Sequence, residues 1–132
     1  MSDNELEKIR MKKTEMLMNG QTMPKNIIDI HSIDELNQLI NDFPNKIIVV
    51  DFWAVWCGPC KFISPIFKQL QHEYSQDFIF VKINVDENPL ISQNFRITGI
   101  PTLLFIKNNK IVHKIIGASS YQHLKQILEK LK

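Results

Sequence analysis

Cys57 and Cys60 are the residues of this chain best suited to covalent chemistry, and together they form a single C-x-x-C motif. They are the only cysteines in the chain, so no second pair exists to complete a four-ligand zinc site. The four histidines do not supply one either, because no two of them have the H-x₃₋₅-H spacing of zinc ligands. The pattern therefore favours thiol–disulfide redox chemistry over a structural metal, and we expect no bound metal.

The position of Cys57 indicates which cysteine is the nucleophile. The apolar run 46–53 (KIIVVDFW) predicts a strand covered on both sides, and helical spacing begins soon after Cys60. Cys57 should therefore lie at a helix N-terminus, where unpaired N–H groups and a partial positive charge stabilise a thiolate. Cys60 follows one turn later, close enough to bond to Cys57 but placed more deeply, so we expect it to be the resolving thiol.

The two residues between the cysteines bear on the direction of the reaction. Gly58 and Pro59 carry no charge, whereas a histidine between the cysteines would stabilise the thiolate and make the protein an oxidant. We therefore predict a reductant, with a potential nearer ~−270 mV than ~−120 mV.

Two charged residues interrupt the apolar runs and are open to two interpretations. Asp51 in the run 46–53 is either a desolvated carboxyl with a raised pKa, able to exchange protons with Cys60, or a strand-end residue turned to solvent. Lys82, within FVKINV, is either a solvated lysine or a partner to a buried acid.

The periodicity of the remaining sequence predicts the elements that must position these residues. Ser32 and Glu35 form a capping-box pattern, and Pro65 should kink the helix that follows Cys60. We expect strands at 27–30, 46–53, 78–85, 102–106 and 110–116, and helices after Ser32, after Cys60, at about 89–95 and after Ser119-Ser120. The last two strands flank a turn at 107–109. This alternation predicts an α/β fold with a mixed central sheet and helices on both faces.

Composition sets further limits. The chain has 132 residues, 44% of them hydrophobic, which suits one compact domain. No run of eighteen apolar residues predicts a membrane span, and a net charge of +2 gives no reason to expect nucleic acid or a membrane as partner. Residues 1–24 predict a helical extension, either a loosely held tail or an accessory helix docked on the domain or on a partner. Charges throughout this segment exclude a secretory or transit peptide pattern, so we expect a cytoplasmic protein.

Three longer motifs give the chain a specific likeness. The segments VDFWAVWCGPCK (50–61), KINVDENP (82–89) and GIPTLLFIKN (99–108) closely resemble the thioredoxin family, and the likeness extends over residues 27–131. The resemblance implies a thioredoxin fold over residues 25–132, preceded by the extension 1–24.

The resemblance also implies roles for individual residues. Cys57 matches the nucleophile and Cys60 the resolving cysteine, Asp51 the buried acid near the disulfide, and Lys82 the lysine near that acid. Pro101 matches a cis-proline beside the redox pair. The positions matching the shallow apolar substrate groove are Trp56, Gly58, Pro59, Ile100, Pro101 and Gly117. Val55 departs from the family pattern, in which a polar or charged residue is common, and enlarges the apolar rim.

The function implied is that of a protein-disulfide reductase without a bound cofactor. The expected partners are disulfide-containing clients and a thioredoxin reductase that draws electrons from a flavin/NADPH or ferredoxin source, and we expect a monomer. One alternative is a non-catalytic binding module that uses the same groove. Another is a disulfide isomerase or oxidant, which Gly58-Pro59 and the absence of an export signal disfavour.

Overall fold

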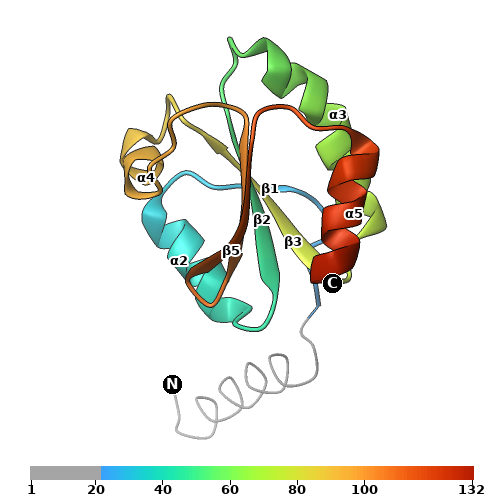
Figure 1. The fold of residues 1–132 in the computed structure, drawn as a ribbon. Helices are drawn as coiled ribbons and strands as arrows, with labels where there is room; N and C mark the ends of the chain where they lie inside the picture. The colour runs from blue at the N-terminus through green and yellow to red at the C-terminus, as the bar shows by residue number, and fades with distance from the viewer. Residues whose placement is uncertain (1–21) are drawn as a thin grey trace, which may run out of the picture.

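The structure is a computed structural model that describes residues 22–132 (Figure 1). In chain order its elements are β1 (Ile28–Asp29), α2 (Ile33–Asp42), β2 (Ile47–Trp53), α3 (Gly58–Glu73), β3 (Phe78–Asn84), α4 (Pro89–Asn94), β4 (Thr102–Lys107), β5 (Lys110–Ile116) and α5 (Tyr121–Leu131). Each expected strand and helix after residue 26 is present. The predicted helix in the extension lies almost entirely outside the described residues.

The strands form one mixed sheet in the order β1-β3-β2-β4-β5. β3 pairs in parallel with β1 and β2, whereas β4 pairs antiparallel with β2 and β5. β2 is central, and its first six residues are buried, as the continuous apolar run predicts. In this register Asp51 lies opposite Lys82 on β3 and Leu103 on β4.

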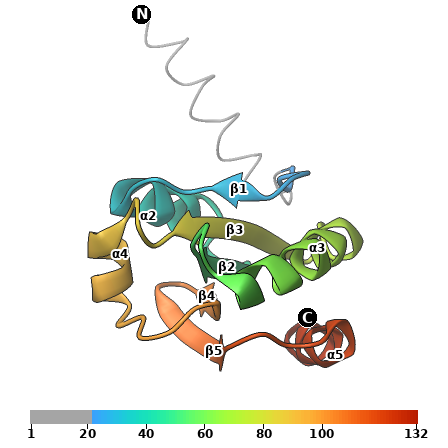
Figure 2. The same ribbon diagram turned by 90° about the horizontal axis from the view of Figure 1, so that it is seen from above.

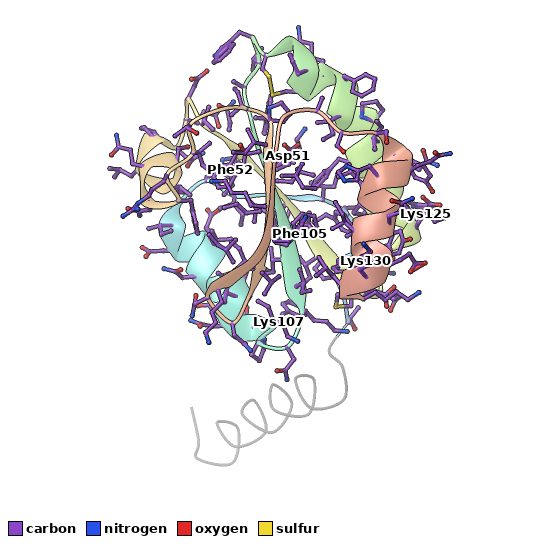
Figure 3. All side chains as sticks on the ribbon, in the orientation of Figure 1. Asp51, Phe52, Phe105, Lys107, Lys125 and Lys130 are labelled. Atoms are coloured by element: carbon purple, nitrogen blue, oxygen red, sulfur yellow. A yellow bond between two sulfur atoms is a disulfide. The ribbon has the colours of Figure 1, made fainter. Side chains whose placement is uncertain are left out.

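Helices cover both faces of the sheet, as predicted. Figures 1 and 2 show α2 and α4 on one face and α3 and α5 on the other. One core cluster packs Leu36 and Ile40 of α2 and Ile91 of α4 against the sheet. The other packs α3 and α5 against the opposite face. In Figure 3, Asp51, Phe52 and Phe105 lie among the packed interior side chains, and Lys125 and Lys130 lie on the outer side of α5.

Local signals account for the helix starts. The Ser32 hydroxyl accepts a hydrogen bond from the Glu35 N–H at 3.1 Å, as the capping pattern predicts. The Glu35 carboxylate accepts from the N–H of His31 at 2.8 Å, which extends the cap by one residue. At α5 the Ser120 hydroxyl accepts from the His123 N–H. Pro65 lies inside α3, as expected.

The hairpin between β4 and β5 turns on two asparagines. Asn108 and Asn109 have φ values of 51° and 66°, the left-handed conformation that a tight hairpin turn requires and that asparagine tolerates. The predicted turn included Lys107, but this residue still pairs with Lys110 and ends β4. β5 lies at the edge of the sheet and is mostly exposed.

The folded domain begins slightly earlier than the sequence predicts. Met23, placed by the sequence in the extension, is buried and belongs to the core cluster beneath α2.

Within residues 22–132, no helix has both the length and the apolarity needed to cross a bilayer.

Candidate active site

The two cysteines lie where β2 passes into α3. Cys57 is the N-cap of α3, and its sulfur accepts a hydrogen bond from the Cys60 N–H at 3.2 Å. The two sulfurs are joined in a disulfide, with the Cα atoms 5.3 Å apart. Pro59 lies in the first turn, where a missing N–H costs nothing. The positive end of α3 and the Cys60 N–H therefore meet the Cys57 sulfur, the arrangement that favours its thiolate once the disulfide is reduced.

The burial of the cysteines differs from expectation. Cys57 is 3% exposed and Cys60 is 4% exposed, so whole-residue burial does not place Cys60 deeper. The reason is that both sulfurs share one small cluster with Ala54, against which Trp53 and Ile100 pack. Burial in the disulfide form therefore does not distinguish Cys57 from Cys60. A difference in their reactivity must come from the position of Cys57 at the helix N-terminus, or from a change in exposure when the disulfide is reduced.

The loop before β4 brings the second half of the expected groove to this cluster. The Ile100–Pro101 peptide bond is cis, as the family likeness implied, and Ile100 packs on the disulfide cluster. The Pro101 carbonyl accepts a hydrogen bond from the Gly117 N–H at 2.8 Å. Gly117 has a φ of 93°, a conformation that favours glycine. The structure thus brings Ile100 against the disulfide and holds Gly117 to Pro101.

The other expected groove residues form an exposed apolar rim. Trp56 is 69% exposed and Val55 is 65% exposed, and Gly58 and Pro59 are also open to solvent. Phe62, one turn along α3, is 59% exposed and was not among the predicted residues. Large apolar side chains exposed together are typical of a protein-binding surface.

An aspartate that the sequence analysis missed fixes the largest of these side chains. The Trp56 indole N–H donates to Asp86 Oδ2 at 2.8 Å. Asp86 is itself placed by Asn84, whose side-chain oxygen accepts from the Asp86 N–H at 2.9 Å. The segment NVDEN (84–88), which begins at the last residue of β3, carries the signal for such a turn, because asparagine side chains commonly bond to backbone two residues ahead.

Asp51 is the most perturbed titratable group of the described residues. It is 1% exposed, and neither carboxylate oxygen has a hydrogen-bond partner among residues 22–132. Burial raises the pKa of Asp51 from 3.8 to about 7, and the positive charge of Lys82 partly opposes this rise. Of the two interpretations left open by the sequence, the solvent-facing carboxyl is wrong and the desolvation of Asp51 is confirmed. Proton exchange between Asp51 and Cys60 stays a prediction.

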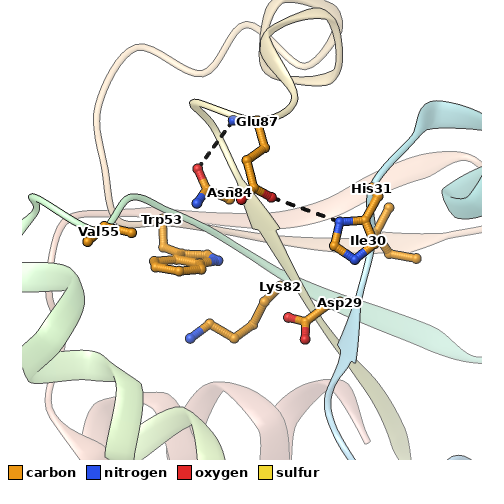
Figure 4. A pocket seen from close by; sticks show the side chains of 8 residues that line it. All are labelled: Asp29, Ile30, His31, Trp53, Val55, Lys82, Asn84 and Glu87. Carbon is orange, nitrogen blue, oxygen red and sulfur yellow. Dashed lines mark hydrogen bonds and ion pairs between the residues drawn. The ribbon is translucent and has the colours of Figure 1, made fainter.

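Lys82 does not form an ion pair with Asp51, although the two residues are aligned on neighbouring strands. Its Nζ lies 4.6 Å from the centroid of the Trp53 ring, a cation–π contact. Figure 4 shows Lys82 and Trp53 side by side in a pocket of about 260 Å³ between β1, β2 and β3. The pocket is lined by Asp29, Ile30, His31, Trp53, Val55, Lys82, Asn84 and Glu87. Lys82 thus influences Asp51 through its charge alone.

No donor set for a metal accompanies the cysteines. Within the part of the chain that the structure describes, no three His, Cys, Asp or Glu residues gather closely enough to hold a metal ion. The chemistry that the two cysteines offer is that of a dithiol and its disulfide.

Comparison with known proteins agrees with this geometry. The family model described as Thioredoxin matches residues 27–130. The chain is 36% identical over 104 residues to Thioredoxin-T of Drosophila melanogaster, covering 79% of this chain and 66% of that protein. It is 47% identical over 74 residues to a thioredoxin of Chlorobaculum thiosulfatiphilum, covering 56% of this chain and 68% of that protein.

A solved structure extends the likeness to three dimensions. The chain superposes on the crystal structure of Schistosoma mansoni thioredoxin with a TM-score of 0.74 at 37% identity, covering 82% of this chain and 97% of the other. The matched sequence relatives are covered over about two thirds of their lengths, and this structure over almost all of its length.

Proposed function

Because this chain belongs to the thioredoxin family of thiol–disulfide oxidoreductases, we propose that it acts mainly as a protein-disulfide reductase through Cys57 and Cys60. The observation that carries the proposal is the Cys57 sulfur at the N-cap of α3, bonded to Cys60 one turn later. This geometry can store two electrons as a dithiol and release them by forming the disulfide.

The first step is nucleophilic attack by the Cys57 thiolate. The thiolate attacks one sulfur of the client disulfide, a mixed disulfide forms, and the other client sulfur leaves as a thiolate. The N-terminus of α3 stabilises the Cys57 anion before attack. The uncharged pair Gly58-Pro59 adds no cation, which keeps the dithiol reducing.

The second step resolves the mixed disulfide. Cys60 loses its proton to the Asp51 carboxylate and attacks the Cys57 sulfur, so the second client sulfur leaves as a thiolate and later takes a proton. The client disulfide is thereby reduced to two thiols, and Cys57 and Cys60 become a disulfide. With a pKa of about 7, Asp51 is suited to exchange a proton near neutral pH.

The client docks on the apolar surface around the cysteines. Trp56, Gly58, Pro59, Ile100, Pro101 and Gly117 form this groove, and the exposed apolar side chains of Val55 and Phe62 enlarge it. Backbone groups beside the cis-proline pair with an extended client segment, a form of β-augmentation.

The remaining cycle requires an external electron source. A thioredoxin reductase returns the disulfide to the dithiol, and the chain itself needs no bound cofactor. We place this cycle in the cytoplasm, with the chain acting as a monomer in electron transport and redox homeostasis.

The test is reduction of a disulfide-linked model protein by the full chain. Cys57→Ser should abolish turnover, whereas Cys60→Ser should form a mixed disulfide at Cys57 that persists and can be identified by mass spectrometry. Full activity of Cys57→Ser, or a trapped adduct at Cys60 in the wild type, would contradict the assignment.

A second candidate function is a binding module that uses the same groove without electron transfer. The exposed rim around Trp56 would support it. A Cys57→Ser/Cys60→Ser variant that restores the phenotype of a deletion strain would favour this role, and failure to restore it would favour the reductase.

A further inference from the structure

The C-terminal part of the chain differs from the rest in charge. Residues 96–132 contain seven Lys or Arg and one acid, Glu129, whereas residues 22–95 contain five Lys and nine acids. No acid at all occurs between Glu87 and Glu129, and Glu129 is paired with Lys132 at 3.3 Å. The small net charge of the chain therefore combines an acidic part with a basic part, and the basic part comprises β4, β5 and α5.

The basic side chains lie on one side of the fold. Figures 1 and 2 show β5 and α5 on the same side of the molecule, away from β1. Figure 3 shows Lys107 near the hairpin and Lys125 and Lys130 on the outer side of α5. Lys107, Lys110 and Lys114 are exposed, and none of the three forms an ion pair with another described residue. The hairpin of β4 and β5 thus presents positive charge that no acid of the described residues neutralises.

β5 leaves its outer edge open. It pairs with β4 alone and is the last strand in the sheet order, so the backbone groups on its other side have no strand partner among the described residues. Six of its seven residues are exposed, and the apolar side chain of Ile116 is 59% exposed. Free backbone groups beside exposed apolar side chains are suited to an extended polypeptide that adds a strand.

The register with β4 limits where such a strand can pair. The pairing is regular over residues 113–116 of β5 and shifts at Val112, which has no partner on β4. Because an irregularity of this kind bends the strand, the regular edge consists of residues 113–116. Lys114 lies within this stretch, and Lys110 lies beyond it at the hairpin. A short segment with an apolar residue beside Ile116 and acids beside the two lysines would match this edge.

The regular edge begins at the proposed client groove. Gly117 follows β5, and its N–H donates to the Pro101 carbonyl at 2.8 Å. The Ile116 side chain lies against Gly99, and its Cγ2 would be 3.7 Å from a Cβ placed on that glycine. Gly99 precedes Ile100, which packs on the disulfide cluster. A client whose disulfide is held in the site can therefore continue onto β5 through a short stretch of chain.

We infer that the outer edge of β5 is an accessory docking site for an acidic, extended segment of the client, and that it selects clients in which such a segment lies close to the disulfide. This inference rests on the proposed reductase function. A nucleic-acid backbone would pair with the lysines but leave the backbone groups and Ile116 without partners, and an anionic membrane would leave the backbone groups unpaired. A second copy of the chain offers, at the edges of its described sheet, only another basic β5 or the two-residue strand β1.

A cysteine-free peptide tests the docking edge independently of redox chemistry. In antiparallel pairing, Val-Thr-Glu-Thr-Gly-Glu-Glu places valine beside Ile116 and glutamate beside Lys114, and its acidic end reaches toward Lys110. Added to the full chain, it should shift the NMR signals of residues 113–116. A matched peptide with lysine in place of each glutamate should bind roughly tenfold more weakly, and high salt should reduce the difference.

N-methylated forms of the peptide separate strand addition from simple charge attraction. Alternate N–H groups of a strand point to the same side, so only one of two sets can pair with β5. Methylation of the first and third residues, or of the second and fourth, should therefore remove binding in one peptide and leave it in the other. Equal binding of both methylated peptides, equal binding of the glutamate and lysine peptides, or shifts confined to other elements would overturn the proposal.

Disulfide-linked client peptides test selection by the full chain. Each carries a cysteine, a four-residue Gly/Ser spacer that spans about 13 Å, and then the glutamate or the lysine segment. The KM should be roughly tenfold lower for the glutamate client. Lys110→Glu/Lys114→Glu should reverse this preference, whereas Lys68→Glu, on the exposed side of α3, should keep it.

The outcomes distinguish the two proposals. If both clients are reduced with the same KM, the docking inference fails while the reductase function stands. If neither client is reduced, the reductase function itself fails, and the role of β5 in client selection fails with it. A DNA duplex that binds at residues 113–116 more tightly than the glutamate peptide would assign the edge to nucleic acid and would also overturn the inference.

Discussion

Asp51 and Lys82 occupy aligned positions on the neighbouring strands β2 and β3, yet their opposite charges do not meet as an ion pair. Lys82 instead lies over the Trp53 ring, and the two oxygens of Asp51 are left without partners among the described residues. An acid in this position is easier to protonate than an exposed one, because burial penalises its charged form. Because Asp51 changes its charge near neutral pH, we expect both the stability of the fold and the rate of disulfide exchange to depend on pH.

Replacing Asp51 with asparagine should stabilise the fold at neutral and alkaline pH. The pKa of Asp51 is about 7 in the folded chain against an ordinary 3.8, so the folded state binds the proton more tightly. Stability from this group is therefore fully present below pH 3.8 and is lost as the pH rises through about 7. The difference between these two pKa values corresponds to on the order of 4 kcal/mol in the free energy of unfolding at pH 8. Urea unfolding of the wild type and of Asp51→Asn from pH 4 to 8 measures this difference, and Asp77→Asn is the control. Equal stabilities of the two proteins at every pH would contradict a buried charge at Asp51.

The same substitution should slow resolution of the mixed disulfide. In the proposed mechanism the Asp51 carboxylate accepts the proton of Cys60. Removing this carboxylate should therefore lower the rate of this step about 100-fold near pH 7. Stopped-flow measurement of client release should show a rate that rises with pH around 7 in the wild type and lacks this inflection in Asp51→Asn. An unchanged inflection would assign the proton transfer to another group.

Lys82→Met should raise the pKa of Asp51 above its present value of about 7. Lys82 lowers this pKa through its charge, and methionine keeps the apolar length of the side chain without that charge. Titration of the Asp51 carboxyl by NMR measures the shift. Lys68→Met on the exposed side of α3 is the control, and a fall in the Asp51 pKa on removing Lys82 would be incompatible with the geometry.

Asp86→Ala should weaken client binding more than it weakens the fold. It removes the acceptor that holds the Trp56 indole, while both side chains are exposed. We expect the KM for a protein disulfide to rise several-fold and stability to change by less than about 0.5 kcal/mol. Glu87→Ala, at the next residue, should leave KM unchanged. If the two variants behave alike, the Trp56–Asp86 hydrogen bond has no part in recognition.

Substitution by alanine should destabilise the fold at Gly117 but not at Gly58. A Cβ would meet no atom within 4 Å at either position, but only Gly117 has a positive φ. Gly117→Ala should therefore cost about 1 to 2 kcal/mol through backbone strain. Gly58→Ala, in the first turn of α3, should be neutral or slightly stabilising. Thermal unfolding compares them, and equal losses would point to a packing effect rather than to φ.

The sequence was informative wherever one residue type satisfies one local requirement. The apolar run of β2, the Ser32 and Ser120 caps and the asparagine turn were predictable because each solves a local backbone problem. The cis bond at Pro101 was not predictable from local preference, since most X–Pro bonds are trans, and it followed only from the family likeness.

Relationships across the fold could not be derived from the chain. The Trp56–Asp86 hydrogen bond joins residues thirty positions apart, and its formation depends on the loop after β3. The stacking of Lys82 on Trp53, rather than pairing with Asp51, is decided by side-chain direction on adjacent strands. The shared burial of both cysteines likewise depends on packing from the distant residue Ile100.

The outer strand β5 has a consequence for how the molecule behaves when crowded. It leaves one edge of the described sheet open and exposes the apolar side chains of Ile111 and Val112, a surface on which another chain could add a strand. Lys110, His113 and Lys114 stand on the same strand, and the register shifts between Phe105 and Ile106 beside it. Positive charge and an irregular pairing partner both oppose the growth of sheets from molecule to molecule, so replacing these lysines with threonine would be expected to promote fibrillar aggregates in concentrated solutions.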